Sequence, residues 1–127
     1  MAKLMKGAVT IKLKYKAGWT PAQKAAADMK VSALNEADLV VTHNATRASN
    51  MRGRFQKAGG TLKKNEDLDH IVDLQLGGKD AFSNMKGLDF SVNRSLGPQI
   101  QNQIKHLPDA TRVKKVIIGD PIAKKKR

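Results

Sequence analysis

Residues 68–94 read LDHIVDLQLGGKDAFSNMKGLDFSVNR, and this stretch decides the fold. Its first four residues alternate in the manner of a short, half-buried strand. Neighbours in a strand point to opposite faces, so the strand has to end or bulge near His70 for Asp69 and His70 to share a face. Gly77-Gly78 indicates a turn, and residues 84–88 indicate a second short strand. The stretch therefore predicts a hairpin with a long loop.

The apolar period changes to four from about residue 89. Val92, Leu96, Ile100 and Ile104 form one stripe of a helix. Pro98 is expected to kink or restart this helix, because proline lacks the backbone N–H that an inner helical turn uses. Asn93 then lies in the first turn, beside the stripe.

The polar residues of this unit occur in the order that a one-metal phosphodiesterase needs. A histidine of ordinary pKa, about 6.5, is largely neutral at pH 7 to 8 and can accept a proton from water, which makes His70 the candidate general base. Asp69 and Asn93 offer hard oxygen ligands to a divalent cation at the scissile phosphate. The chain is therefore predicted to be a nuclease.

These motifs resemble the HNH, or His-Me finger, nucleases, whose shared unit is called ββα-metal. His70 precedes Asn84 by fourteen residues and Asp69 precedes Asn93 by twenty-four. That spacing is similar to the HNH domains of RNA-guided CRISPR nucleases and, approximately, to phage junction-resolving nucleases. The strings at residues 68–78 and 91–97, with Gln99-Ile100, resemble the C-terminal HNH domains of bacterial polymorphic toxins. The resemblance covers roughly residues 15–120, weakly before residue 58.

The resemblance implies a role for each matching residue. Asn84 would brace the loop across the hairpin and orient the histidine, a role compatible with its alternative as the turn residue that opens the second strand. Mg²⁺ is the expected metal and Mn²⁺ an alternative. Zn²⁺ and Ni²⁺ are less expected, because nuclease relatives suited to them carry histidine in place of Asn93. Arg94 is a secondary candidate, either a phosphate clamp or an exposed helix residue. Asp73 is a loop cap, a partner for a basic residue or part of the site.

The composition favours a polyanionic substrate. The chain has 24 Lys and Arg against 11 Asp and Glu, a net charge of +13 and a pI near 10.2. Such a charge attracts phosphate backbones without reading sequence, although ribosome-associated and membrane-surface proteins are basic too. Aromatic residues make up 4%, too few for a platform that stacks bases. The absence of cysteine fits a reducing cytoplasm or translocation without disulfides.

The length of 127 residues and the 40% apolar content predict one α+β domain. We expect a supporting strand and helices over about residues 1–60, the ββα-metal core over 64–106, a final strand over 107–120 and a basic tail over 121–127. The strand alternates over residues 9–15. A helix should begin with Thr20 as N-cap and Pro21 at its first position and end near residue 35. It carries a small-residue face of Ala22, Ala25, Ala26, Met29 and Ala33.

The remaining segments leave alternatives open. Residues 39–41 are a short strand or the approach to a helix over about 45–58, which Gly59 ends. Four basic residues of that helix form a DNA-facing surface or a solvated face: Arg47, Arg52, Arg54 and Lys57. Residues 111–118 suggest a last strand, paired with the first, and Trp19 is expected in the core. His43 and His106 are structural or surface residues by default. The tail at 124–127 contacts nucleic acid, resembles a localisation signal or solubilises the chain end.

The preferred function is a metal-dependent, largely sequence-nonspecific DNA endonuclease, the toxic C-terminal domain of an antibacterial effector. The resemblance implies an acidic immunity protein as partner, and action in the cytoplasm of a bacterial target cell. We expect no signal peptide, because lysines interrupt the apolar residues of 1–16, and no membrane anchor, because no apolar run approaches the roughly 18 residues of a span. RNA remains an alternative substrate, and oligomeric state is open. The competing functions are a phage or mobile-element HNH endonuclease and a non-catalytic, basic nucleic-acid-binding domain.

Overall fold

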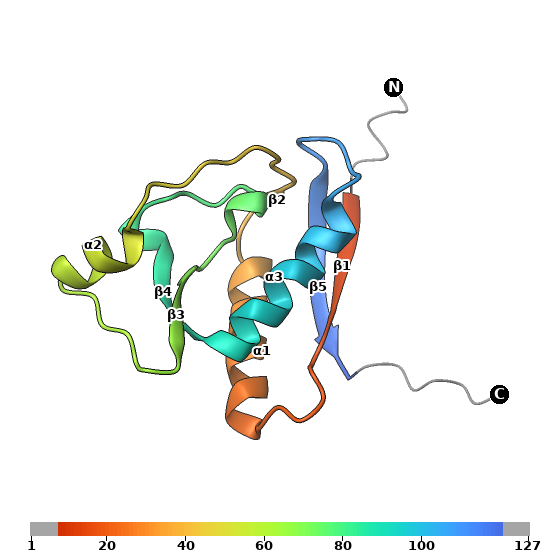
Figure 1. Cartoon of the computed structure of the whole chain (residues 1–127). Helices are drawn as coiled ribbons and strands as arrows, with labels where there is room; N and C mark the ends of the chain where they lie inside the picture. Colours follow the sequence, from red (N-terminus) through yellow and green to blue (C-terminus); the bar gives the residue numbers. More distant parts are fainter. Residues whose placement is uncertain (1–7, 121–127) are drawn as a thin grey trace.

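Two small sheets lie on either side of two long helices in the computed structural model, which describes residues 8–120 (Figure 1). The predicted α+β class is confirmed. The elements follow in the order β1 (Ala8–Lys14), α1 (Pro21–Asn35), β2 (Leu39–Val40), α2 (Met51–Lys57), β3 (Glu66–His70), β4 (Met85–Asp89), α3 (Phe90–Ile104) and β5 (Arg112–Gly119), with 3-10 turns at Leu74–Leu76 and Phe82–Asn84.

The first sheet has the strand order β1-β5-β2, with β5 parallel to β1 and antiparallel to β2. The predicted pairing of the first and last strands is therefore confirmed. The outer edge of β1 is closed by two glutamines of α3. Gln103 accepts a hydrogen bond from the backbone N–H of Lys12 (2.9 Å) and donates one to its carbonyl (2.7 Å), and Gln99 does the same for Lys14 (2.8 and 3.1 Å). These bonds use backbone groups that an open edge would offer to another chain.

Helix α1 begins as predicted but buries a different face. Thr20 and Gln23 form a capping box, and Pro21 takes the first helical position. The buried residues are Ala27, Lys30, Val31 and Leu34, and Met29 of the expected small-residue face is 63% exposed. The larger apolar area of valine and leucine decides which side of the helix meets the core.

Helix α2 is shorter than predicted, because residues 42–50 form a loop instead of its first turns. Asn44 and Asn50 adopt left-handed backbone conformations, with φ of 59° and 54°. Asn50, the residue directly before Met51, is outside helical geometry, so a helix cannot run through it, and the backbone N–H groups of His43 and Ala48 donate to the carboxylates of Asp109 and Asp80. The end of the helix agrees with the prediction, since Gly59 follows it with φ +102°.

Strands β3 and β4 form an antiparallel hairpin, and α3 begins directly after it. The register runs without interruption from Glu66 opposite Asp89 to His70 opposite Met85. Strand β3 therefore ends at His70, as the sequence predicted for Asp69 and His70 to share a face. Helix α3 continues through Pro98 and does not restart there. Pro98 has no N–H to donate to the carbonyl of Arg94, one turn earlier. Both residues are exposed, so water can bond that carbonyl instead.

One hydrophobic core joins both sheets and both long helices. The predicted stripe of α3 is buried along its whole length, from Val92 to Ile104. Trp19 is 7% exposed and donates a hydrogen bond to Ser91, which confirms its expected place in the core. No helix among residues 8–120 combines the length and the apolar character needed to cross a membrane. The alternatives for the basic tail fall outside the described residues.

Asp89 connects the hairpin to α3, so we expect D89A to destabilise the protein. Its carboxylate accepts the backbone N–H groups of Ser91 and Val92 at 2.9 and 3.1 Å and also bonds Gln23 and Asn65. Loss of an N-cap costs about 0.5–2 kcal/mol, and we expect the upper part of that range in urea unfolding. D38A, an exposed substitution, is the control, and equal stability of the two variants would contradict the assigned cap.

Candidate active site

A cavity of about 500 Å³ lies where the end of β3 meets α3, and three predicted site residues line it: Asp69, His70 and Asn93. Two of them come from the last positions of β3 and the third from the first turn of α3. Residues of the 42–50 loop, Arg47 among them, line the cavity as well. Strand β3 and helix α3 thus bring Asp69, His70 and Asn93, which are separated in the sequence, to one cavity.

The imidazole of His70 is held by a carboxylate. Its Nε2 atom lies 2.7 Å from Oδ1 of Asp80, and the two side chains are 12% and 18% exposed. The hydrogen bond from His70, followed by one from the Ala48 backbone N–H, lowers the pKa of Asp80 below its ordinary value. Among residues 8–120 the other ring nitrogen, Nδ1, has no hydrogen-bond partner. Nδ1 is therefore the ring atom that remains for a water molecule.

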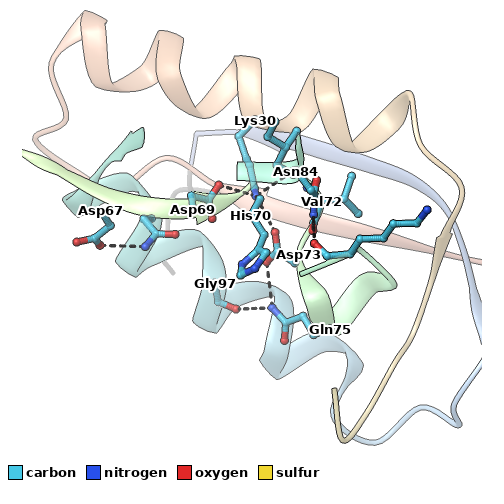
Figure 2. A network of polar contacts seen from close by, with 12 residues as sticks. Lys30, Asp67, Asp69, His70, Val72, Asp73, Gln75, Asn84 and Gly97 are labelled. Carbon is cyan, nitrogen blue, oxygen red and sulfur yellow. Dashed lines mark hydrogen bonds and ion pairs between the residues drawn. The ribbon is translucent and has the colours of Figure 1, made fainter. Parts of the chain in front are cut away.

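Lys30 reaches from α1 into the turn after β3, where Figure 2 shows it among Asp69, His70 and Asp73. Its ammonium nitrogen lies 2.8 Å from Asp69 Oδ2 and 2.7 Å from Asp73 Oδ1. It also donates to the backbone carbonyls of His70 and Ile71, at 2.5 and 3.1 Å. The side chain is 5% exposed, so a buried cation organises the segment that carries the candidate base. Of the roles considered for Asp73, the structure thus shows that of a partner for a basic residue, Lys30.

Two carboxylates facing one ammonium leave the Lys30–Asp69–Asp73 group with an excess of negative charge. Burial alone would lower the pKa of Lys30, but the attraction of Asp73 and Asp69 outweighs it and raises that pKa. Burial raises the pKa of Asp69, and Asp73 adds to the rise, against the opposite effect of Lys30. An additional cation near Asp69 would therefore be favoured electrostatically.

Asn93 is oriented by a neighbouring aspartate. Its amide nitrogen donates to Asp67 Oδ2 at 2.9 Å, which leaves the amide oxygen as the atom that can face the cavity. Arg94 binds the same carboxylate through two nitrogens, at 3.0 and 2.8 Å, and this contact is the main reason that the pKa of Asp67 is lowered. Arg94 does not line the cavity and its side chain is 67% exposed. Its role as a phosphate clamp remains a prediction.

Asn84 spans the loop of the hairpin. Its side chain accepts the backbone N–H of Val72 and donates to the Val72 carbonyl, both at 2.9 Å, and it also donates to the Lys79 carbonyl at 2.8 Å (Figure 2). Gly78 must be a glycine here, because a Cβ atom would lie 1.8 Å from the Val72 carbonyl oxygen. These contacts fit a residue that braces the turn next to His70, and Asn84 also ends the 3-10 turn that precedes β4.

The site offers donors of the kind that Mg²⁺ prefers. Among the described residues, the Oδ1 atoms of Asp69 and Asn93 accept no hydrogen bond, and the adjoining group carries excess negative charge. No group of three or more His, Cys, Asp or Glu side chains with metal-binding geometry occurs between residues 8 and 120. Mg²⁺ commonly binds through one or two protein oxygens and keeps several waters, so two protein ligands fit that ion.

Three residues of the site escaped sequence reasoning: Lys30, Asp67 and Asp80. Lys30 had a signal, since it interrupts the apolar stripe of Ala27, Val31 and Leu34 on α1. Asp67 also had one, because it lies two positions before Asp69 and so on the same face of β3. Asp80 had none, as an aspartate in a loop ordinarily indicates only a turn.

The other predicted basic residues divide between the cavity and the surface. Of the four between residues 45 and 58, only Arg47 lines the cavity. His43 lines it too, and its Nε2 atom lies 2.7 Å from the carbonyl oxygen of Leu107. His106 is exposed and does not line the cavity.

No protein-family model matches the chain, and comparison with curated proteins and with solved structures gives no match either.

Proposed function

We propose that this chain is a metal-dependent endonuclease that hydrolyses DNA phosphodiester bonds with little sequence preference. The observation that supports the proposal is the shared cavity of Asp69, His70 and Asn93, at the place where β3 meets α3, with β4 following β3 and preceding α3 in the chain. This order of elements is the one that the resemblance to HNH nucleases led us to expect. The same resemblance supports a toxic domain of an antibacterial effector, with an acidic immunity protein as its partner and the target-cell cytoplasm as its place of action.

Each residue has a part in the proposed reaction. The Nδ1 atom of His70 accepts a proton from the water that attacks phosphorus. Asp69 and Asn93 would hold the metal through their free oxygens, and Asn84 keeps the turn beside His70 in place. When bound, a divalent cation supplies positive charge against the scissile phosphate and the departing 3′ oxygen.

The charge of the protein supports a nucleic-acid substrate. Arg47 and Lys105 line the cavity, in a chain of net charge +13. Such residues attract the phosphate backbone in general, so the expected binding is strong at low salt and independent of sequence. DNA is preferred to RNA on the resemblance alone.

A non-catalytic, basic nucleic-acid-binding domain is the second candidate function. This candidate is favoured because two of the predicted site residues already have ionic partners within the protein: Asp69 contacts Lys30, and His70 contacts Asp80. A catalytic site has to leave atoms free for water and metal, and a binding domain does not. The two functions therefore differ in whether the protein turns over a phosphodiester substrate.

Incubation with supercoiled plasmid, linear duplex and RNA, each with Mg²⁺, Mn²⁺, Zn²⁺ or a chelator, tests the proposal. We expect nicked and then linear plasmid in Mg²⁺ and Mn²⁺ and intact plasmid in the chelator, because the metal offsets charge in the transition state. Binding without cleavage under every metal condition would favour the second candidate. Cleavage that persists in the chelator would contradict a metal-dependent mechanism.

A further inference from the structure

Two aspartates anchor the 42–50 loop through its backbone N–H groups. Asp109 Oδ1 accepts from His43 and Asp80 Oδ2 accepts from Ala48, each at 2.7 Å. Only Asp80 has a second contact, because its Oδ1 atom lies 2.7 Å from Nε2 of His70. One carboxylate thus connects the candidate base to the loop that carries Arg47.

We propose that Asp80 is a positioning residue for His70, which fixes the imidazole as the Nε2–H tautomer and so directs the basic Nδ1 nitrogen to the attacking water. The inference rests on the proposed nuclease function. Because it concerns how the base is held, it can fail while that function stands.

The chemistry follows from the hydrogen-bonding capacity of the two groups. An ionised carboxylate can only accept hydrogen bonds, so a neutral imidazole facing Asp80 has to carry its proton on Nε2. The lone pair is then on Nδ1, the nitrogen without a partner among residues 8–120. Partners that fix a histidine in this way set both its tautomer and its orientation. The hydrogen bond from His70 lowers the pKa of Asp80, which keeps this carboxyl group ionised.

Two substitutions of Asp80 should have unequal effects. In D80N the backbone N–H of Ala48 still needs an acceptor at the position of the present Oδ2 atom, so the amide oxygen of the new asparagine takes that position. The amide nitrogen is then turned toward His70 and donates to Nε2, which moves the imidazole proton to Nδ1 and blocks the base. D80A frees the ring without imposing the wrong tautomer. We therefore expect D80N to be the more damaging of the two, although it is closer to aspartate in shape.

Plasmid-cleavage kinetics in Mg²⁺ measure this difference. We expect kcat to fall about 10- to 100-fold in D80A, the range found for residues that orient metal-binding histidines. A further loss of at least about tenfold is expected in D80N, since an Asp-to-Asn change behind the histidine of a serine protease costs about 10⁴-fold. KM for the plasmid and the Mg²⁺ concentration for half-maximal rate should stay unchanged in both variants.

D109A is the matched control, because Asp109 anchors the same loop without touching the imidazole. It should keep the kcat of the unmodified protein. Nitrogen-detected NMR of the His70 ring gives a second readout that a purely structural role would not change. The ring proton should be on Nε2 in the unmodified protein and on Nδ1 in D80N, with thermal melting used to establish that each variant is folded.

A kcat in D80N equal to that of the unmodified protein, or above that of D80A, would overturn the inference. Equal losses in D109A and D80A would overturn it too, because loop anchoring alone would then explain them. If the unmodified protein cleaves plasmid and the variants show such a result, the inference fails alone. If the unmodified protein does not cleave, the proposed function fails and the inference fails with it.

Discussion

H70A is expected to lower the rate of plasmid cleavage in Mg²⁺ by about 100- to 10,000-fold, the usual contribution of a general base. Of the three predicted site residues at the cavity, His70 is the candidate proton acceptor, because Asp69 contacts Lys30 and the amide of Asn93 is not a base. DNA binding should be retained, because H70A removes none of the 24 lysines and arginines that give the chain its net charge of +13. Binding is measured by fluorescence anisotropy with a labelled duplex in the presence of chelator.

H106A and H43A are the controls for this experiment. His106 is exposed and outside the cavity, whereas His43 lines the cavity without contacting Asp80. Both variants should retain most of the activity of the unmodified protein. Full activity in H70A would show that the base is assigned to the wrong residue, and a large loss in H43A would transfer the role to that histidine.

K30M is expected to lower the free energy of unfolding by about 3–5 kcal/mol, the cost of removing one partner from a buried ion pair. Methionine has a similar length but no charge, so Asp69 and Asp73 would remain buried without their cation. Because small domains have about 5–15 kcal/mol of stability in total, the variant should unfold at far lower urea concentrations. K86M, an exposed substitution on β4, should change the stability by less than about 0.5 kcal/mol.

The pH dependence of K30M gives a check on its cause. In the unmodified protein the pKa of Lys30 is raised. The contribution of Lys30 to the free energy of unfolding is therefore complete below pH 10.5, its ordinary pKa, and is lost as the pH rises through the pKa of the folded state. The pKa of Asp69 is raised as well, so keeping this buried carboxylate ionised at neutral pH costs stability. In K30M, acid should protonate Asp69 and restore part of the lost free energy of unfolding. Mg²⁺ should also restore part of the loss, because a ligand of the folded state stabilises it. Wild-type stability in K30M at neutral pH would contradict the buried triad.

Local sequence patterns predicted the hairpin, the start of α1 and the stripe of α3. Each depends on neighbours within one or two turns: the Thr20 cap, the four-residue spacing from Val92 to Ile104 and the glycines before β4. The start of α2 could not be predicted in the same way. Two backbone N–H groups of residues 42–50, those of Ala48 and His43, bond Asp80 and Asp109, which lie more than thirty positions away.

The site was predictable where spacing encodes geometry and not where distant segments meet. Asp69, His70 and Asn93 belong to one continuous unit, so their convergence follows from the hairpin and helix. Lys30 enters from a helix about forty positions earlier, and only its interruption of an apolar stripe indicates it. Arg94 was expected beside the metal ligand, but the preference of its planar fork for the nearby Asp67 carboxylate places it outside the cavity.

Titration of Mn²⁺ into isotopically labelled protein tests the proposed metal site most directly, since a bound paramagnetic ion broadens the NMR signals of the residues around it. The signals of Asp69, His70 and Asn93 should broaden first and recover when excess Mg²⁺ displaces the Mn²⁺. D69N and N93A should each weaken this effect, whereas D28N, a change at an exposed carboxylate of α1, should not. Broadening that begins at exposed carboxylates and leaves Asp69 and Asn93 sharp would contradict a shared metal site in the cavity.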